Sequence, residues 1–435
     1  MRKPPAWAIP LVVTLGLVLS ACNLGSSEPT ATEATVAALP SATPDACGGD
    51  AIGCVDIAPG EPIHLAYMLA LSGDLAFLGE DSLGGIEIAV DDAGGTLLGH
   101  PILLTGEDSV CSSEGGMAAA LNVTADPSIL GVIGTNCMSA MSAALDTISG
   151  AGLSIISPSI TAPGLTLEDL VWKPGTFRAI VNDLAQGMFA AEYAYNELNA
   201  TTVATIHDGT PYADHLQEVM ASRFAELGGT VTFQGAVSLG DTDMSAALTA
   251  AAAGSPEVLY LPVFEPEGSL IVAQAADFVG LENTILIGAD GLIVDAFPES
   301  AGVNAIGMYL TGPNISGPAY DAFLVGWAMK YGGEPPSRAH SFAYDATNLL
   351  LEGISQAAVQ DLDGTLHIGR QALRDAISNI SGFPGLSGTL NCGDESFAGV
   401  EVSKGDCATE DALAIYEITA AEVSQGKWPP EVVFP

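Results

Sequence analysis

The fold is decided by residues 258–287, which read VLYLPVFEPEGSLIVAQAADFVGLENTILI. Two short apolar runs, Val258–Val263 and Thr284–Ile287, stand on either side of a segment of helix length, Gly268–Val279. An apolar strand, a helix and a second apolar strand in this order are typical of a parallel sheet that is covered by helices. The stretch therefore predicts an α/β fold built on parallel strands.

The same alternation runs outward from this stretch, beginning at Ile63. Other strands are expected at Ile63–Leu71, Ile102–Gly106, Leu130–Gly134, Leu153–Ser157, Thr202–His207 and Thr230–Val237, with segments of helix length between most of them. A chain of 435 residues exceeds the size at which one hydrophobic core stops growing. We therefore predict two doubly wound parallel-sheet lobes. Lobe 1 is assigned residues 61–181 and 314–388, and lobe 2 is assigned residues 182–313 and 389–435.

The charge balance excludes some classes of partner. The formal net charge is −41, because 52 acidic residues face only 11 Lys and Arg. Nucleic acid needs a basic footprint for its phosphates, so we expect no nucleic-acid partner. A basic membrane-binding face is equally unsupported.

The first 21 residues predict an export signal. Arg2 and Lys3 precede an apolar run, Ala6–Leu19, that is short for a membrane span and is followed by small residues. Leu19-Ser20-Ala21-Cys22 resembles a bacterial lipobox. The resemblance implies that Cys22 becomes the acylated first residue of an exported lipoprotein, anchored to the membrane and facing the periplasm or the cell exterior. The alternatives are an ordinary signal peptide and an uncleaved anchor.

Residues 22–60 read as a flexible tether, because they are rich in Ser, Thr, Ala, Pro and Gly and lack periodic hydrophobicity.

Six cysteines remain after Cys22, and an even number in an exported chain favours disulfides. Proximity in sequence suggests Cys47 with Cys54, Cys111 with Cys137, and Cys392 with Cys407. Six cysteines allow 15 connectivities, so these pairings rest on loop size alone. Zinc is the alternative, but no C-x-x-C pair occurs and no His stands at ligand spacing from a cysteine. We expect no metal and no cofactor.

Short hydroxyl side chains follow two successive strands of the first lobe. Thr135 to Ser139 follow Leu130–Gly134, and Pro158 to Thr161 follow Leu153–Ser157. Ligands of open α/β sheets lie beyond the carboxyl ends of strands, where helix N-termini offer free N–H groups. These residues could hold a carboxylate without Lys or Arg. Taken singly, Ser139 or Thr161 could instead be a helix cap.

Several ordered motifs between Ile63 and the C-terminus resemble one known family. These are the opening strand with its glycines, Ala66–Gly79; Gly131-Val132-Ile133-Gly134 with Cys137; Ile156-Ser157-Pro158-Ser159-Ile160-Thr161; Phe177-Arg178 with Asp183, Gln186 and Gly187; and His207-Asp208 with Tyr212. The family is the substrate-binding proteins of branched-chain amino acid ABC importers. It implies the type I periplasmic binding protein fold, with a multi-strand hinge between the lobes.

The resemblance also implies a ligand site in the cleft between the lobes. It assigns ligand-binding roles to Leu78, Met138, Ser139, Ser159, Thr161, Asp183, Tyr212, Phe264 and Asp290. The α-carboxylate of an amino acid would lie at Ser139, Ser159 and Thr161, and Asp290 would receive its ammonium. Met138 and Asp290 depart from the family, which usually has Ser and Glu there. By local chemistry alone, Asp290 before Gly291 reads as a turn residue.

The function that the resemblance implies is capture of a small ligand, an aliphatic branched-chain amino acid, for delivery to an ABC permease and ATPase complex. A monomer is expected. Related proteins take amides, urea-like molecules or small aromatic acids, and a tethered sensor is a further alternative. An exported hydrolase is the rival class, but G-x-S-x-G and H-E-x-x-H are absent and the six His are scattered. We therefore expect no enzymatic activity.

Overall fold

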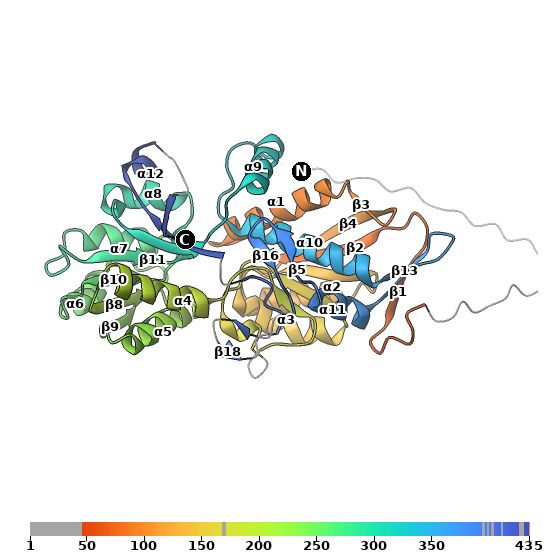
Figure 1. The fold of residues 1–435 in the computed structure, drawn as a ribbon, viewed down its shortest axis with the longest axis horizontal. Helices are drawn as coiled ribbons and strands as arrows, with labels where there is room; N and C mark the ends of the chain where they lie inside the picture. The colour runs from red at the N-terminus through yellow and green to blue at the C-terminus, as the bar shows by residue number, and fades with distance from the viewer. Residues whose placement is uncertain are drawn as a thin grey trace, which may run out of the picture. The chain divides into compact units, whose positions relative to one another are not determined.

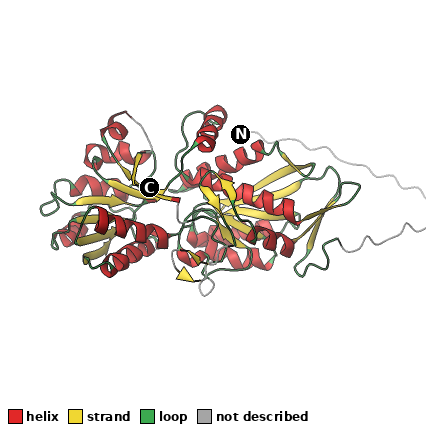
Figure 2. Cartoon of the chain, in the orientation of Figure 1, coloured by secondary structure: helices red, strands yellow, loops and turns green. Residues whose placement is uncertain are grey.

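Two sheets carry the fold in the computed structural model (Figure 1, Figure 2). The structure describes residues 46–167, 171–393, 396–397, 400–401, 404–409, 412–425 and 430–434. The expected signal peptide, Cys22 and the tether as far as residue 45 lie outside these residues. No helix among the described residues is long and apolar enough to cross a membrane.

The first sheet has the strand order β3-β4-β2-β5-β6-β7. Its strands are β2 (Ile63–Leu69), β3 (Thr96–Leu97), β4 (His100–Asp108), β5 (Ile129–Gly134), β6 (Ser154–Ser157) and β7 (Thr176–Arg178). All neighbours pair in parallel except β3 with β4. The connecting helices are α1 (Ala76–Asp92), α2 (Ser113–Thr124) and α3 (Met138–Gly150). Every residue of β5 is buried, as expected of a strand covered on both faces.

The second sheet has the order β20-β19-β12-β11-β10-β8-β9. Its strands are β8 (Thr202–His207), β9 (Thr230–Ala236), β10 (Val258–Leu261), β11 (Ile285–Gly288), β12 (Tyr309–Pro313), β19 (Leu413–Glu417) and β20 (Glu431–Phe434). Strands β8 to β12 pair in parallel, and β19 and β20 add an antiparallel edge. Its helices are α4 (Asp183–Glu192), α5 (Pro211–Glu226), α6 (Ser245–Ala252), α7 (Glu267–Ala275), α8 (Ala296–Ala301) and α12 (Ala420–Gln425).

Later helices return to the first sheet. They are α9 (Pro318–Lys330), α10 (Ala339–Ala357) and α11 (Arg370–Ser378). Helix α10 lies beside α1 (Figure 1). Gly85 of α1 allows this close approach, and Gly84 allows a similar approach of α9, which carries Trp327. A Cβ on Gly85 would stand 2.1 Å from the carbonyl oxygen of His340, and a Cβ on Gly84 would stand 2.3 Å from the ring of Trp327.

The end of the expected tether is instead part of the folded chain. Strand β1 (Cys54–Ile57) pairs antiparallel with β14 (Leu366–Gly369), which also pairs with β13 (Ala358–Gln360). Val55 and Ile57 enter the core of the first lobe. The tether prediction is therefore wrong for residues 54–57, because their two apolar side chains find a partner strand far away in the sequence.

The segment after residue 389 is divided between the lobes. The remaining short strands are β15 (Phe383–Gly385), β16 (Gly388–Leu390), β17 (Ser396–Phe397) and β18 (Val400–Glu401). Cys392 and Cys407 pack in the same core as Phe177 of β7, while β19 and β20 join the second sheet. The assignment of all of 389–435 to lobe 2 therefore differs from the structure.

A buried polar cluster fixes one crossover between the lobes. Arg178 is fully buried, and its guanidinium donates to Asp406, to the carbonyl of Ala162 at 2.8 Å and to the hydroxyl of Thr166 at 2.6 Å. Asn182 also donates to Asp406, at 3.1 Å. Because a buried guanidinium needs both a counter-charge and acceptors, the cluster stabilises the crossover only when all of these partners are in place.

Candidate ligand-binding site

A cavity of about 740 Å³ is lined by residues of both lobes. Eight of the nine side chains expected to bind ligand line it: Leu78, Met138, Ser139, Ser159, Thr161, Tyr212, Phe264 and Asp290. Asp183, the ninth, does not line it. The volume lies within the range of small-molecule sites.

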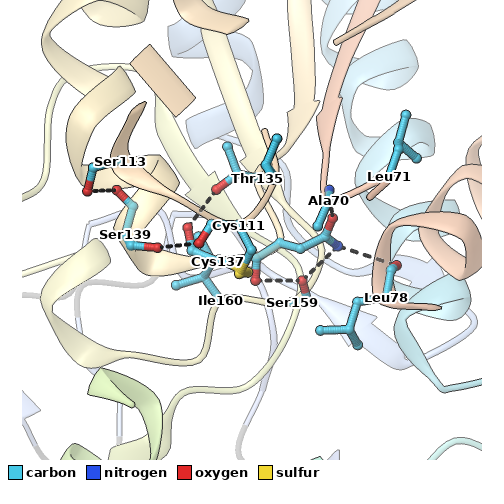
Figure 3. The surroundings of a disulfide bond; sticks show 12 residues. Ala70, Leu71, Leu78, Cys111, Ser113, Thr135, Cys137, Ser139, Ser159 and Ile160 are labelled. Carbon is cyan, nitrogen blue, oxygen red and sulfur yellow. Dashed lines mark hydrogen bonds between the residues drawn. A yellow bond between two sulfur atoms is a disulfide. The ribbon is translucent and has the colours of Figure 1, made fainter. Parts of the chain in front are cut away.

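The first lobe contributes the N-terminus of α3 and the loop after β6. The first N–H groups of α3 have no intrahelical acceptor, and its N-cap residue, Cys137, supplies no side-chain cap for them. The Ser139 hydroxyl donates to the carbonyl of Cys111 at 2.9 Å, and the Ser159 hydroxyl donates to the carbonyl of Asn136 at 3.2 Å (Figure 3). Since both hydroxyl protons are engaged within the protein, an anion here would be held chiefly by backbone N–H groups.

Asn136 organises this wall. Its side-chain oxygen accepts from the N–H of Ala70 at 2.9 Å, and its side-chain nitrogen donates to Ser159 at 3.1 Å and Ser82 at 2.9 Å. The amide therefore ties β2, α1 and the loop after β6 together at the end of β5. Sequence reasoning assigned it no role, although it lies in the polar stretch Thr135 to Ser139.

The Cys111–Cys137 disulfide joins the loop after β4 to the start of α3 (Figure 3). Both cysteines line the cavity. The other two pairs are Cys47 with Cys54 and Cys392 with Cys407. The three pairings predicted from sequence proximity are thus confirmed.

The second lobe contributes Asp290, which lies just beyond the end of β11. Its Oδ1 accepts from the Tyr212 hydroxyl at 2.8 Å and from Nε2 of Gln186 at 2.9 Å. Burial raises the pKa of the Asp290 carboxyl, while these two donors act in the opposite direction. The rings of Tyr212 and Phe264 lie 4.8 Å apart, so the hydroxyl that orients Asp290 is itself fixed by packing.

Asp183 lies behind this wall, at the first position of α4. It is fully buried, and neither of its carboxylate oxygens has a hydrogen-bond partner among the described residues. Burial raises its pKa to about 8, the nearby Thr161 side chain acts to lower the pKa, and the charge of Asp290 acts to raise it. Oε1 of Gln186 is also buried and unpartnered.

Most of the remaining wall is apolar. It includes Phe77, Ile160, Ile180, Ile293, Val294 and Phe342. The charged side chains on the wall are Asp74, Glu265, Glu267, Asp290 and Arg338. Sequence reasoning missed Arg338; the scarcity of basic residues was the one signal that could have drawn attention to it.

One group of possible metal ligands among the described residues lies outside the cavity lining. Cys54, Asp56 and His367 bring their ligand atoms within 4.8 Å of one another. Cys54 is bonded to Cys47 and offers no thiolate. His367 is already bound by the carboxylates of Asp56 and Asp361, at 2.8 and 3.2 Å.

Comparison with known proteins decides the family. The sequence profile described as "Periplasmic binding protein" matches residues 62–401. The chain belongs to this family. The resemblance and the type I periplasmic binding protein fold that the sequence predicted are thereby confirmed. As a periplasmic binding protein, the chain is a solute-binding protein of an ABC importer. It takes a small-molecule ligand, works with a permease and ATPase, and acts outside the cytoplasm.

Curated relatives of this periplasmic binding protein include a Leu/Ile/Val-binding protein homolog 1 of Brucella suis biovar 1. The two are 30% identical over 320 residues, covering 73% of this chain and 82% of the relative. An amino acid binding protein of Pseudomonas aeruginosa is 29% identical over 233 residues, which cover 53% of this chain and 61% of that protein.

Solved structures support the same fold for this periplasmic binding protein. The leucine binding protein LivK of Thermotoga maritima superposes with a TM-score of 0.71 at 24% identity, covering 86% of this chain and 97% of that one. The substrate binding protein LivJ of Streptococcus pneumoniae, in complex with isoleucine, gives 0.70 at 24% identity, covering 86% and 100%. A solute binding protein of R. palustris in complex with benzoate gives 0.68 at 18% identity, covering 86% and 96%.

Proposed function

We propose that the protein captures a small α-amino acid in the cavity between its lobes and delivers it to an ABC importer. The observation that carries this proposal is the partly buried Asp290 carboxylate, oriented by Tyr212 and Gln186 on the cavity wall. An acid that is held out of water in this way favours a cationic partner.

The ammonium of the ligand would lie against Asp290. An ammonium has three donors, and beside Asp290 the buried Oε1 of Gln186 is an acceptor without a partner among the described residues. Asp290 therefore contacts the ligand in this proposal. Asp183 does not line the cavity, so it does not touch the ligand in this proposal, which differs from the direct contact expected from the sequence.

The carboxylate of the ligand would lie at the N-terminus of α3. Free N–H groups and the partial positive charge of a helix start suit an anion, and Met138 and Ser139 line the cavity there. Thr161 lies on the same wall, from the loop after β6. The two charged ends of a zwitterion would thus be held by opposite lobes.

The aliphatic class of ligand is supported by two observations. Leu78, Ile293, Val294 and Phe342 offer an apolar wall, and the relatives are named for leucine, isoleucine and valine. Amides, urea-like molecules and small aromatic acids are the alternatives, and the benzoate complex of a structural relative is the observation that favours the last. A non-enzymatic role fits a family of solute-binding proteins.

The mode of attachment is a further part of the proposal. Cleavage before Cys22 and acylation of that residue would anchor the protein, as a monomer, by two or more acyl chains. Cys22→Ser should then move the protein from the membrane fraction to the soluble fraction. Unchanged membrane retention of that variant would contradict the anchor.

A ligand screen tests the proposed function. We expect the protein without its first 45 residues to show a rise in melting temperature with aliphatic amino acids, followed by calorimetry on each positive compound. The matched control for the variant Asp290→Asn is Asp295→Asn, because Asp295 is an exposed acid next to the cavity residue Val294. Binding of benzoate or urea but of no amino acid would overturn the amino acid assignment.

A further inference from the structure

Arg338 is the one cationic side chain among the described residues that line the cavity. It stands at the N-cap position of α10, where the chain of the first lobe passes close to β12 and β19 of the second sheet. Ile293, Val294 and Phe342, which line the same cavity, are apolar.

Among the described residues, the partners of the guanidinium are all neutral. Nη1 donates to the carbonyl of Pro313 at 3.3 Å and to the hydroxyl of Tyr416 at 3.1 Å. Its Cζ lies 5.1 Å from the centre of the Tyr416 ring. Nε is buried and has no hydrogen-bond partner within the described part of the chain. Arg338 therefore keeps an unused donor and a charge that these partners leave uncompensated.

Arg370 and Arg374 also donate to backbone carbonyls, and Nε of Arg374 is likewise buried without a partner among the described residues, but neither side chain lines the cavity. Other basic side chains have an acidic partner. Arg178 is bound to Asp406, Arg223 to Glu192 and Lys330 to Asp91. The chain has 52 acidic residues and 11 Lys and Arg, so the lack of a carboxylate partner for Arg338 among the described residues does not reflect a shortage of acids. A half-buried guanidinium without an acid pays a desolvation cost that an acceptor on a ligand would offset.

The backbone that carries Arg338 is fixed on both sides. The Ser337 hydroxyl donates to Asp81 at 2.6 Å, and the N–H of His340 donates to the same carboxylate at 2.7 Å. Since the backbone and Nη1 are both held, the guanidinium has one orientation, in which Nη2 is the terminal nitrogen without a hydrogen bond among the described residues. Such a planar, preorganised fork suits recognition of a carboxylate or amide oxygen.

We infer that Arg338 recognises an sp² oxygen at the end of the ligand's side chain, so that the cavity prefers amino acids of the glutamine and glutamate class over purely aliphatic ones. This inference rests on the proposed α-amino acid site and replaces its purely aliphatic side chain with one that ends in an sp² oxygen. The apolar wall then packs against the methylene groups of the side chain, and Arg338 binds the oxygen beyond them. The two glutamates of the cavity wall are already engaged, Glu265 by Ser269 and Glu267 by the N–H of Gly240.

Calorimetry on the wild-type protein and on Arg338→Met tests this inference with L-leucine, L-glutamine and L-glutamate. We expect the wild type to bind glutamine or glutamate at least tenfold more tightly than leucine. Arg338→Met should weaken the preferred polar ligand at least tenfold and change leucine affinity less than threefold. Either order of glutamine and glutamate supports the inference, because both carry the oxygen. Tighter binding of glutamate would identify a carboxylate as the group that Arg338 recognises, and tighter binding of glutamine would identify an amide.

Two controls separate this role from a structural one. Lys330→Met removes a cation that lies outside the cavity lining and should leave all three affinities unchanged. Equal losses for leucine and the polar ligands in Arg338→Met would overturn the inference in favour of a structural role at the hinge. Wild-type protein that prefers leucine would overturn it even if the variant failed to fold. Absence of binding by every amino acid would instead contradict the proposed function.

Discussion

The hydroxyl of Tyr212 donates a hydrogen bond of 2.8 Å to Oδ1 of Asp290, and the N–H of Gly291 donates to the same hydroxyl at 3.2 Å. The phenol therefore joins the candidate ammonium acceptor to the backbone that follows it. Because the ring packs against Phe264, this geometry exists before any ligand arrives. Preorganised contacts of this kind reduce the entropy that binding must overcome.

Tyr212→Phe tests this relationship. The change removes one donor to a charged acceptor but keeps the ring, so leucine affinity should fall about fivefold, or about 1 kcal/mol. Calorimetry provides the measurement. Tyr195→Phe is the matched control, because that ring packs against Phe224 and does not line the cavity. Identical affinities of wild type and Tyr212→Phe would show that the hydroxyl does not support the site.

Asp183 should make the stability of the ligand-free protein depend on pH. Its pKa rises from 3.8 to about 8 on folding, so the folded state holds a proton that the unfolded chain has lost. Stability should therefore fall as the pH rises from about 4 to about 8. The substitution Asp183→Asn removes this pH dependence. Its melting temperature should exceed that of wild type by about 2 to 4 °C at pH 8 and match it near pH 4. A constant difference across this range would contradict the assignment.

The Cys111–Cys137 disulfide should support both stability and binding. It joins residues separated by 26 positions, and its loss should cost about 3 kcal/mol of unfolding free energy. Because it fixes the start of α3, the double variant Cys111→Ser, Cys137→Ser should also weaken leucine binding. The pair Cys47→Ser, Cys54→Ser is the control, since it should lower stability without changing affinity. Denaturant unfolding and calorimetry measure the two effects. Unchanged leucine affinity in the variant Cys111→Ser, Cys137→Ser would contradict a role of this disulfide in the ligand site.

Ligand groups from both lobes imply that binding favours a closed state. Small-angle scattering should therefore show a smaller radius of gyration with saturating leucine than without it. Asp290→Ala at the same leucine concentration is the control, and should scatter like the ligand-free protein. Scattering that does not change although calorimetry shows saturation would mean that the ligand is held without closure.

The sequence predicted the main strands because their apolar runs are local signals. The runs at Ile63 and Val258 reappear as β2 and β10. Strand β1 was missed because its pairing, Cys54 with Gly369, joins residues more than 300 positions apart. Such a partner cannot be read from a segment rich in Pro and Gly.

The residues of the site were harder to predict from the sequence than the strands. Asp290 reads locally as a turn residue, and only the family resemblance indicated its place on the cavity wall. Asp183 was expected to touch ligand, but its side chain is covered. Arg338 could not be found from its neighbours in sequence, because its partners Pro313 and Tyr416 come from strands on either side of it along the chain.

The most direct test of the proposed amino acid site is calorimetry of L-leucine and of its deamino analogue, 4-methylpentanoate, on wild type and Asp290→Ala. Truncation of one member of a buried charged pair typically costs about 2 to 5 kcal/mol in binding. Leucine should therefore bind Asp290→Ala at least tenfold more weakly, whereas Thr161→Ala should lose less. Wild type should bind the analogue poorly, and Asp290→Ala should discriminate less between the two compounds. Leucine binding to Asp290→Ala as tightly as to wild type would contradict the ammonium site and favour an uncharged or anionic ligand.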